Sequence, residues 1–99
     1  MQIEFHPEAR TEFLEATSRY ESHVPGLGTR FISEIDRCLK LLLQSPGIGA
    51  GFGNKLRRFP LNDGFPFSLV YAVHDHTLLV VAVAHQSRKP GFWRHRERD

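Results

Sequence analysis

After a short N-terminal segment, the apolar residues of this 99-residue chain change their spacing near residue 55, and this change constrains the fold more than any other feature. Before it, apolar residues recur every three or four positions, as on one face of an α-helix. After it, they alternate with polar residues or form short runs rich in valine, as in β-strands. The sequence therefore predicts an α+β domain in which two helices come first and most strands come last.

The first half begins with a predicted strand over residues 2–6 that ends at Pro7. Proline suits the first turn of a helix because its missing N–H would have no partner there. A helix is therefore predicted from Pro7 to near His23. Its apolar stripe consists of Ala9, Phe13, Ala16 and Tyr20.

A second helix is predicted between Pro25-Gly26 and Ser45-Pro46. Its apolar stripe consists of Leu27, Phe31, Ile35, Cys38, Leu39 and Leu42. The two helices form an antiparallel hairpin whose apolar stripes face a common sheet. The glycines at positions 47, 49, 51 and 53 predict a flexible loop after the hairpin. Cys38 is expected to fill the core, and the use of one cysteine agrees with a reducing compartment.

Three strands are predicted over residues 55–61, 65–73 and 78–85, forming an antiparallel meander. Asn62-Asp63-Gly64 suits the positive φ angles of the first connection. The spacing of His74 and His76 is possible for a metal pair, but it is expected to be a turn because no cysteine or carboxylate cluster accompanies it. We expect one compact domain over residues 1–99, without a metal or another cofactor.

Alternation along the predicted strands indicates which side chains share a face of the sheet. Arg57 falls on the side of Phe59 and is expected to pair with a glutamate of the first helix. Arg58 falls on the opposite, open face, which Ser68 and other small side chains line. The period does not indicate the face of His85, because both alternation sets of its strand are apolar.

The charge of the chain is unevenly distributed. Residues 1–53 carry five Lys/Arg and seven Asp/Glu, whereas residues 54–99 carry eight and four. The second half therefore suits an acidic partner, either nucleic acid or an acidic protein segment. The longest apolar run has seven residues, against about 20 for a membrane-spanning helix. With no export signal at its start, the chain is expected to be cytoplasmic and not to associate with membranes.

Basic and aromatic residues interleave beyond the last strand, in VAVAHQSRKPGFWRHR (residues 81–96). This segment resembles the terminal signature of the RelE/ParE superfamily of bacterial toxins, in its ParE-like, plasmid stabilisation branch. Pro7-Glu8-Ala9 and the segments 57–61 and 65–71 match the family pattern in the same order. The resemblance implies the small RelE/ParE-like fold: an N-terminal strand, a helical hairpin, a three-stranded meander and a short basic-aromatic tail.

The resemblance implies the toxin of a type II toxin–antitoxin system. Its partner would be a cognate antitoxin that wraps it with a helix and an extended segment. Operator DNA would be bound only through the antitoxin. ParE-like toxins poison DNA gyrase without being enzymes, and the exposed tail residues Arg88, Trp93, Arg94 and Arg96 would then bind the target.

Two alternatives remain open on the same fold. A RelE-like toxin cuts messenger RNA in the ribosome, with Arg58 and Arg88 clamping phosphate and His85 as acid or base. Such enzymes often carry a C-terminal tyrosine, whereas the last tyrosine here is Tyr71. A degenerate toxin would act only in complex formation and operon repression.

Structural roles are possible for the same side chains. Arg88 could pin the tail to an acidic residue, and Phe92 and Trp93 could close the core over the sheet. His85 could be a hydrogen-bonded structural histidine.

Overall fold

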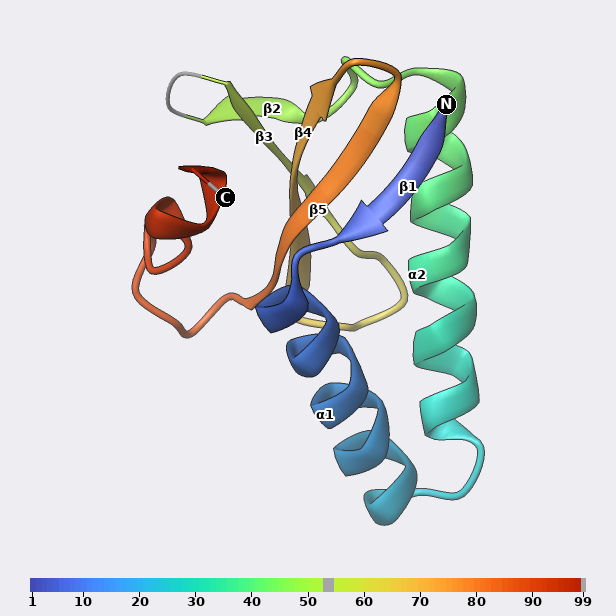
Figure 1. Ribbon diagram of the computed structural model, residues 1–99. Helices are drawn as coiled ribbons and strands as arrows, with labels where there is room; N and C mark the ends of the chain where they lie inside the picture. Colours follow the sequence, from blue (N-terminus) through green and yellow to red (C-terminus); the bar gives the residue numbers. More distant parts are fainter. Residues whose placement is uncertain (53–54, 99) are drawn as a thin grey trace.

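In a computed structural model that describes residues 1–52 and 55–98, a helical hairpin packs against one side of a five-stranded sheet (Figure 1). The elements follow the predicted order. They are β1 (Gln2–Phe5), α1 (Pro7–His23), α2 (Leu27–Gln44), β2 (Ala50–Phe52), β3 (Leu56–Pro60), β4 (Phe67–His74), β5 (Thr77–His85) and the 3-10 helix η1 (Arg94–Arg98). Within the described residues, no helix has the length and apolarity that crossing a membrane requires.

The sheet has the strand order β1-β5-β4-β3-β2. Strands β3, β4 and β5 form the predicted antiparallel meander, with a register shift between Val70 and Tyr71. The sheet is mixed, because β1 pairs with β5 in parallel, with Gln2 opposite Thr77 and Phe5 opposite Val80. Parallel neighbours need a long crossover, and all elements between β1 and β5 supply it.

The glycine-rich loop is tied to the sheet, and part of it forms β2, which was not predicted. The Tyr71 hydroxyl accepts from the Gly49 N–H (3.1 Å) and donates to the Pro46 carbonyl (2.6 Å). A Cβ at Gly49 would lie 2.6 Å from that hydroxyl, so the position requires glycine. Arg57 donates to the Gly47 and Gly49 carbonyls at 3.1 and 2.9 Å, so its predicted pairing with a glutamate of α1 was wrong. Gly53 lies outside the described residues.

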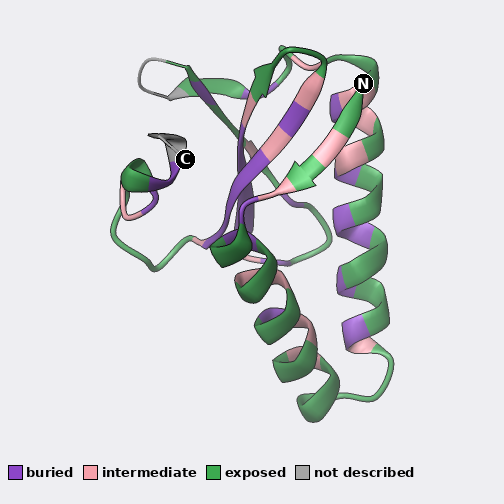
Figure 2. Cartoon of the chain, in the orientation of Figure 1, coloured by how far each residue is buried: buried purple, intermediate pink, exposed green. Residues whose placement is uncertain are grey.

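The main core lies between the hairpin and the sheet, and the buried positions of α2 face the sheet (Figure 2). Both predicted apolar stripes contribute to it. Its fully buried members include Phe31, Leu42, Leu69, Leu78 and Val80. Cys38 is fully buried in this core, as expected, and burial raises the pKa of its thiol to about 12.

A second apolar cluster covers the face of the sheet that was predicted to be open. It consists of Leu56, Val70, Val81, Ala82, Ala84 and Trp93, with Ala72, Leu79 and Phe92 packed against it. The C-terminal segment, residues 86–98, crosses this side of the sheet, away from α2 (Figure 1). The small side chains therefore leave room for Trp93 rather than for solvent.

The two predicted turns have left-handed backbone conformations. Asp63 and Gly64 have φ angles of 62° and 82°, and Asp75 and His76 have φ angles of 48° and 61°. Two consecutive positive φ angles match the right-handed twist of a tight hairpin. Within residues 1–52 and 55–98, no cluster of three or more His, Cys, Asp or Glu side chains could hold a metal ion.

A nearly buried carboxylate, Glu34, joins α2 to the loop between β3 and β4. Arg37 donates to both of its oxygens at 2.8 and 2.6 Å, and the Asn62 N–H donates at 2.7 Å. The hydrogen bonds from Arg37 lower the pKa of Glu34 to about 2, against the desolvation that raises it.

We expect this carboxylate to make the fold sensitive to acid. Its folded-state pKa lies below the unfolded value of 4.5, so its contribution is complete above pH 4.5 and is lost as pH falls towards 2. The loss should be about 2–3 kcal/mol in the free energy of unfolding. Urea unfolding at pH 7 and pH 3 measures it. In Glu34→Gln, the free energy of unfolding should differ less between pH 7 and pH 3 than in the wild-type chain. Glu15→Gln, at an exposed carboxylate, should keep the wild-type difference. An unchanged difference in Glu34→Gln would contradict the assignment.

Candidate functional site

Glu12 of α1 anchors the C-terminal segment through an ion pair with Arg96. The Arg96 nitrogens Nη1 and Nη2 lie 3.0 and 2.9 Å from the two carboxylate oxygens. Only 5% of the Arg96 side chain and 14% of the Glu12 side chain is exposed. Arg96 was predicted to lie on an exposed tail, and that prediction was wrong.

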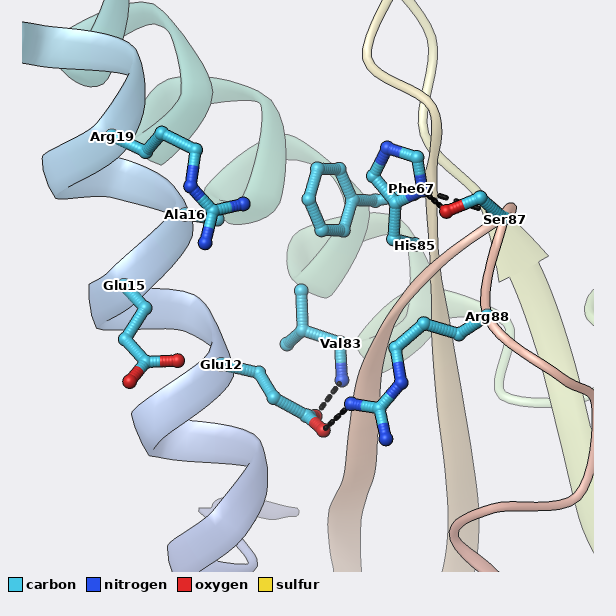
Figure 3. Close-up of a pocket in the computed structure, with 9 residues that line it drawn as sticks. All are labelled: Glu12, Glu15, Ala16, Arg19, Phe67, Val83, His85, Ser87 and Arg88. Carbon is cyan, nitrogen blue, oxygen red and sulfur yellow. Dashed lines mark hydrogen bonds and ion pairs between the residues drawn. The ribbon is translucent and has the colours of Figure 1, made fainter.

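This ion pair also satisfies a strand edge. Because β1 pairs with β5 only as far as Val80, the next residues of β5 have no neighbouring strand on that side. The Val83 N–H donates to Glu12 at 3.0 Å, and Arg96 Nη1 donates to the Val81 carbonyl at 3.1 Å. Two side chains thus take the place of a strand, as buried backbone groups require. Figure 3 shows the bond between Glu12 and Val83.

Arg88 joins the same network from the exposed side. Its Nη1 atom lies 3.6 Å from a Glu12 oxygen (Figure 3), and its guanidinium carbon lies 3.7 Å from the centre of the Phe92 ring. The Arg96 guanidinium lies 5.1 Å from the same ring. Arg88 therefore helps to hold the segment, while about half of its side chain (53%) stays exposed.

Trp93 is also buried, with 4% of its surface exposed. The alternative that it closes the core over the sheet is confirmed, and the prediction of an exposed, target-binding tryptophan was wrong. It packs on the second apolar cluster and meets Phe92 edge to face, with ring centres 4.9 Å apart. The Arg96 N–H donates to the Trp93 carbonyl at 2.8 Å, as in a 3-10 turn. Residues three apart share a side of such a turn, so Trp93 and Arg96 both face inward while Arg94 is exposed.

The three residues predicted for phosphate chemistry, Arg58, His85 and Arg88, line one small pocket of about 110 Å³. Ser68, Ala84, Gln86, Pro90 and Trp93 complete its walls. Arg58 Nε donates to the Ser68 hydroxyl at 3.2 Å. Among the described residues, two guanidinium groups and no carboxylate line this pocket, so its chemistry suits an anion.

His85 lies opposite Phe67 in the sheet, and the two rings meet edge to face with centres 4.9 Å apart. Phe67 belongs to the core on the helix side, so the ring of His85 takes that side. At the end of its strand it also borders the small pocket. Its Nδ1 atom accepts from the Ser87 N–H at 3.0 Å, so the neutral ring carries its proton on Nε2.

Among the described residues that line the small pocket, His85 carries the one imidazole, the side chain that most often serves as a general acid or base. The phenol of Tyr71 is buried on the helix side and is occupied by the loop before β2. The two arginines of the pocket suit a phosphate, but its described lining holds one imidazole and no carboxylate, whereas RNA cleavage uses both an acid and a base.

The sequence placed Ser68 on the face of Arg58 and Phe92 beside Trp93, but it did not indicate Glu12 as the partner of Arg88 and Arg96. A signal existed for Glu12, which lies three residues after Ala9 and four before Ala16, on the apolar side of α1. A carboxylate in that position calls for a buried cation. The spacing does not say that the cation would come from residue 96.

The fold is that of a small ParE-like domain. Over 86% of this chain and 95% of the other, the structure superposes with a TM-score of 0.71 and 19% identity on a chain of the "Chromosomal ParDE TA system from P. aeruginosa". Among curated proteins, no sequence matches this chain.

The family described as "ParE toxin of type II toxin-antitoxin system, parDE" matches residues 3–90. The chain belongs to the ParE toxin family of type II toxin–antitoxin systems. The match ends before Trp93 and Arg96, so the anchored end of the C-terminal segment lies beyond it.

Proposed function

We propose that this chain arrests growth in the cytoplasm by poisoning DNA gyrase, and that a cognate ParD-type antitoxin neutralises it. The observation that carries the proposal is the match to the ParE family over residues 3–90. The small pocket supports it, because its described lining offers one imidazole, whereas RNA cleavage uses both a general acid and a general base. Binding to operator DNA is assigned to the antitoxin.

The target-binding surface in this proposal is the exposed side of the C-terminal segment. Arg88 and Arg94 are exposed and able to contact gyrase or its DNA directly. Trp93 and Arg96 are buried and support these contacts by holding the segment on the sheet. The four predicted target-binding residues therefore divide into two that touch the target and two that position them.

Ribosome-dependent cleavage of messenger RNA is the second candidate. It is favoured by one observation, the convergence of Arg58, His85 and Arg88 on the same pocket. In that case the arginines would neutralise the charge that builds up on phosphate, and the imidazole of His85 would serve as the acid or the base.

The test is a DNA cleavage assay with the purified chain, gyrase, ATP and plasmid. We expect protein-linked double-strand breaks, reduced at least about tenfold in an Arg88→Ala, Arg94→Ala double variant because two cationic contacts are lost. Lys40→Ala, at an exposed lysine of α2, is the matched control and should match the wild-type chain.

Two results would overturn the gyrase proposal. The first is growth arrest by the wild-type chain without DNA breaks, together with no arrest by His85→Gln. That result would indicate cleavage of ribosome-bound messenger RNA. Induction without arrest at any level would leave only a role in complex formation and repression.

A further inference from the structure

The small pocket beside Arg58 lies on the side of the sheet that the C-terminal segment crosses, away from α2 (Figure 1). Arg58 of β3, Ser68 of β4 and Ala84 of β5 form its sheet wall. Arg88 and Trp93 form the wall that the C-terminal segment contributes. Its volume is about 110 Å³, against roughly 300–1,000 Å³ for pockets that enclose a drug-sized ligand. The space therefore suits one small group.

The guanidinium of Arg58 and the hydroxyl of Ser68 act together as hydrogen-bond donors. Arg58 Nε donates to the Ser68 hydroxyl at 3.2 Å, so the hydroxyl keeps its own proton to donate and the two Nη atoms of Arg58 keep theirs. Ser68 is 6% exposed, so its hydroxyl is fixed in the wall. Because the described lining holds no carboxylate, these donors suit the oxygens of a phosphate group.

The contacts of Arg88 hold its guanidinium in place and leave it able to bind a ligand. Its guanidinium carbon lies 3.7 Å from the centre of the Phe92 ring, which supports one face of the group. Its Nη1 atom lies 3.6 Å from a Glu12 oxygen, which is longer than a hydrogen bond. With 53% of the side chain exposed, the N–H groups in its plane can donate to an anion. The pocket thus offers a phosphate two guanidinium groups, one from β3 and one from the C-terminal segment.

Positive charge continues beyond the pocket. Residues 55–61 and 84–96, which supply most of its lining, contain seven Lys/Arg and no Asp/Glu. Lys55, Lys89 and Arg94 are exposed among them. A single small anion would interact mainly with the pocket, whereas a chain of phosphates also gains from the surrounding cations. The charge distribution therefore favours the backbone of a nucleic acid.

The aromatic rings at the pocket favour a duplex over a single strand. Trp93 is 4% exposed, and Arg88 covers the ring of Phe92. Proteins that bind single strands stack the bases on accessible aromatic rings, and both of these rings are already packed. Contacts to the phosphates of a duplex need no such platform.

We propose that the pocket between Arg58 and Arg88 binds a backbone phosphate of duplex DNA, with Lys55, Lys89 and Arg94 facing the neighbouring phosphates. This inference rests on the proposed function for the source of the DNA, which is the duplex held by gyrase. Arg58 thereby joins Arg88 and Arg94 as a residue that touches the target. Phosphate contacts carry no sequence information, so recognition of the operator stays with the antitoxin.

The test measures binding of a short, fluorescently labelled DNA duplex by the purified chain without gyrase, using fluorescence anisotropy at several salt concentrations. Arg58→Gln should weaken binding at low salt at least about fivefold, and should reduce the slope of log Kd against log salt concentration by about one, because one phosphate contact is lost. Lys40→Gln removes the same charge from α2, on the other side of the sheet, and should change binding less than about twofold. Both side chains are exposed, so both variants should unfold at the urea concentration of the wild-type chain.

Arg58→Lys tests the geometry of the pocket at constant charge. Lysine lacks the Nε–H that donates to Ser68 and the forked donors of a guanidinium. Arg58→Lys should therefore bind the duplex more weakly than the wild-type chain. Binding equal to that of the wild-type chain would show an effect of charge alone and would overturn the pocket.

Four other results would also overturn the inference. They are a wild-type chain that does not bind the duplex, equal binding by Arg58→Gln and the wild-type chain, equal losses in Arg58→Gln and Lys40→Gln, and tighter binding to a single-stranded RNA of the same length. Inorganic phosphate at the same concentration of phosphate groups should not displace the duplex. Displacement would assign the pocket to a free anion and would refute the DNA contact.

The gyrase assay separates this inference from the proposed function. If the wild-type chain produces breaks with gyrase but Arg58→Gln binds the duplex as tightly as the wild-type chain, gyrase poisoning stands and the phosphate site is refuted. If duplex binding depends on Arg58 but no breaks form with gyrase, the phosphate site stands and the proposed function is refuted.

Discussion

Replacing Trp93 by alanine is expected to lower the free energy of unfolding by about 3–5 kcal/mol, as for other buried tryptophans. The indole is 4% exposed and covers Val70, Val81 and Ala82, which are fully buried. Its removal leaves a cavity over the sheet and loosens the C-terminal segment. Because small domains have a total stability of about 5–15 kcal/mol, the change should be evident in urea or thermal unfolding.

Arg94→Ala is the matched control, since Arg94 is the exposed neighbour of Trp93. It should change the free energy of unfolding by less than about 0.5 kcal/mol. A Trp93→Ala chain as stable as the wild-type chain would contradict the structural role of the indole. The burial of Trp93 also changes how a toxicity test must be interpreted. A loss of growth arrest after Trp93→Ala, or after deletion of the residues beyond Pro90, would not by itself indicate a lost contact with the target. Either change is expected to disturb the fold.

Glu12→Ala is expected to cost a similar amount, about 3–5 kcal/mol, because it takes from a buried cation its nearest carboxylate and leaves Glu8, at 3.6 Å from Arg96 Nε, as the remaining one among the described residues. The Arg96 side chain is 5% exposed, and the Val83 N–H would also lose its acceptor. Urea unfolding measures the loss. Glu15→Ala removes an exposed carboxylate three residues further along the same helix. Its free energy of unfolding should stay within about 0.5 kcal/mol of the wild-type value.

A double variant separates the ion pair from other contributions of Glu12. Glu12→Gln combined with Arg96→Met keeps an oxygen that accepts from the Val83 N–H and removes the cation that needs a partner. Replacing both members of a buried pair is often close to neutral, so the double variant should recover most of the loss. A double variant less stable than Glu12→Ala would show that the unpaired charge of Arg96 does not cause the loss of stability in Glu12→Ala.

The helices and the meander could be predicted from the sequence because their signals are local. The apolar stripes of α1 and α2, the proline at the start of α1 and the turn at Asp63-Gly64 each depend on neighbours within a few positions. The parallel pairing of β1 with β5 has no such signal, since it joins Gln2 to Thr77. Strand β2 escaped prediction because its ordering comes from Tyr71 and Arg57, which lie on other strands.

The candidate site was predicted in part. Alternation separated Arg58 from Phe59 and placed it on the face where the small pocket lies. The same pattern could not show that Trp93 and Arg96 turn inward, because a basic-aromatic run looks alike whether it is exposed or packed. Burial of Arg96 depends on Glu12, 84 residues earlier in the chain. Charge complementarity over that distance is invisible to a local pattern.

The pairing of the first strand with the last also orders events during synthesis. Strand β1 leaves the ribosome early, but its partner residues, Thr77 to Val80, follow about 75 residues later. At about 5–20 residues per second, β1 waits for several seconds, and Glu12 waits longer still for Arg96. A growing chain therefore cannot complete its sheet before β5 has been made, and the C-terminal segment can be anchored only after Arg96 has followed.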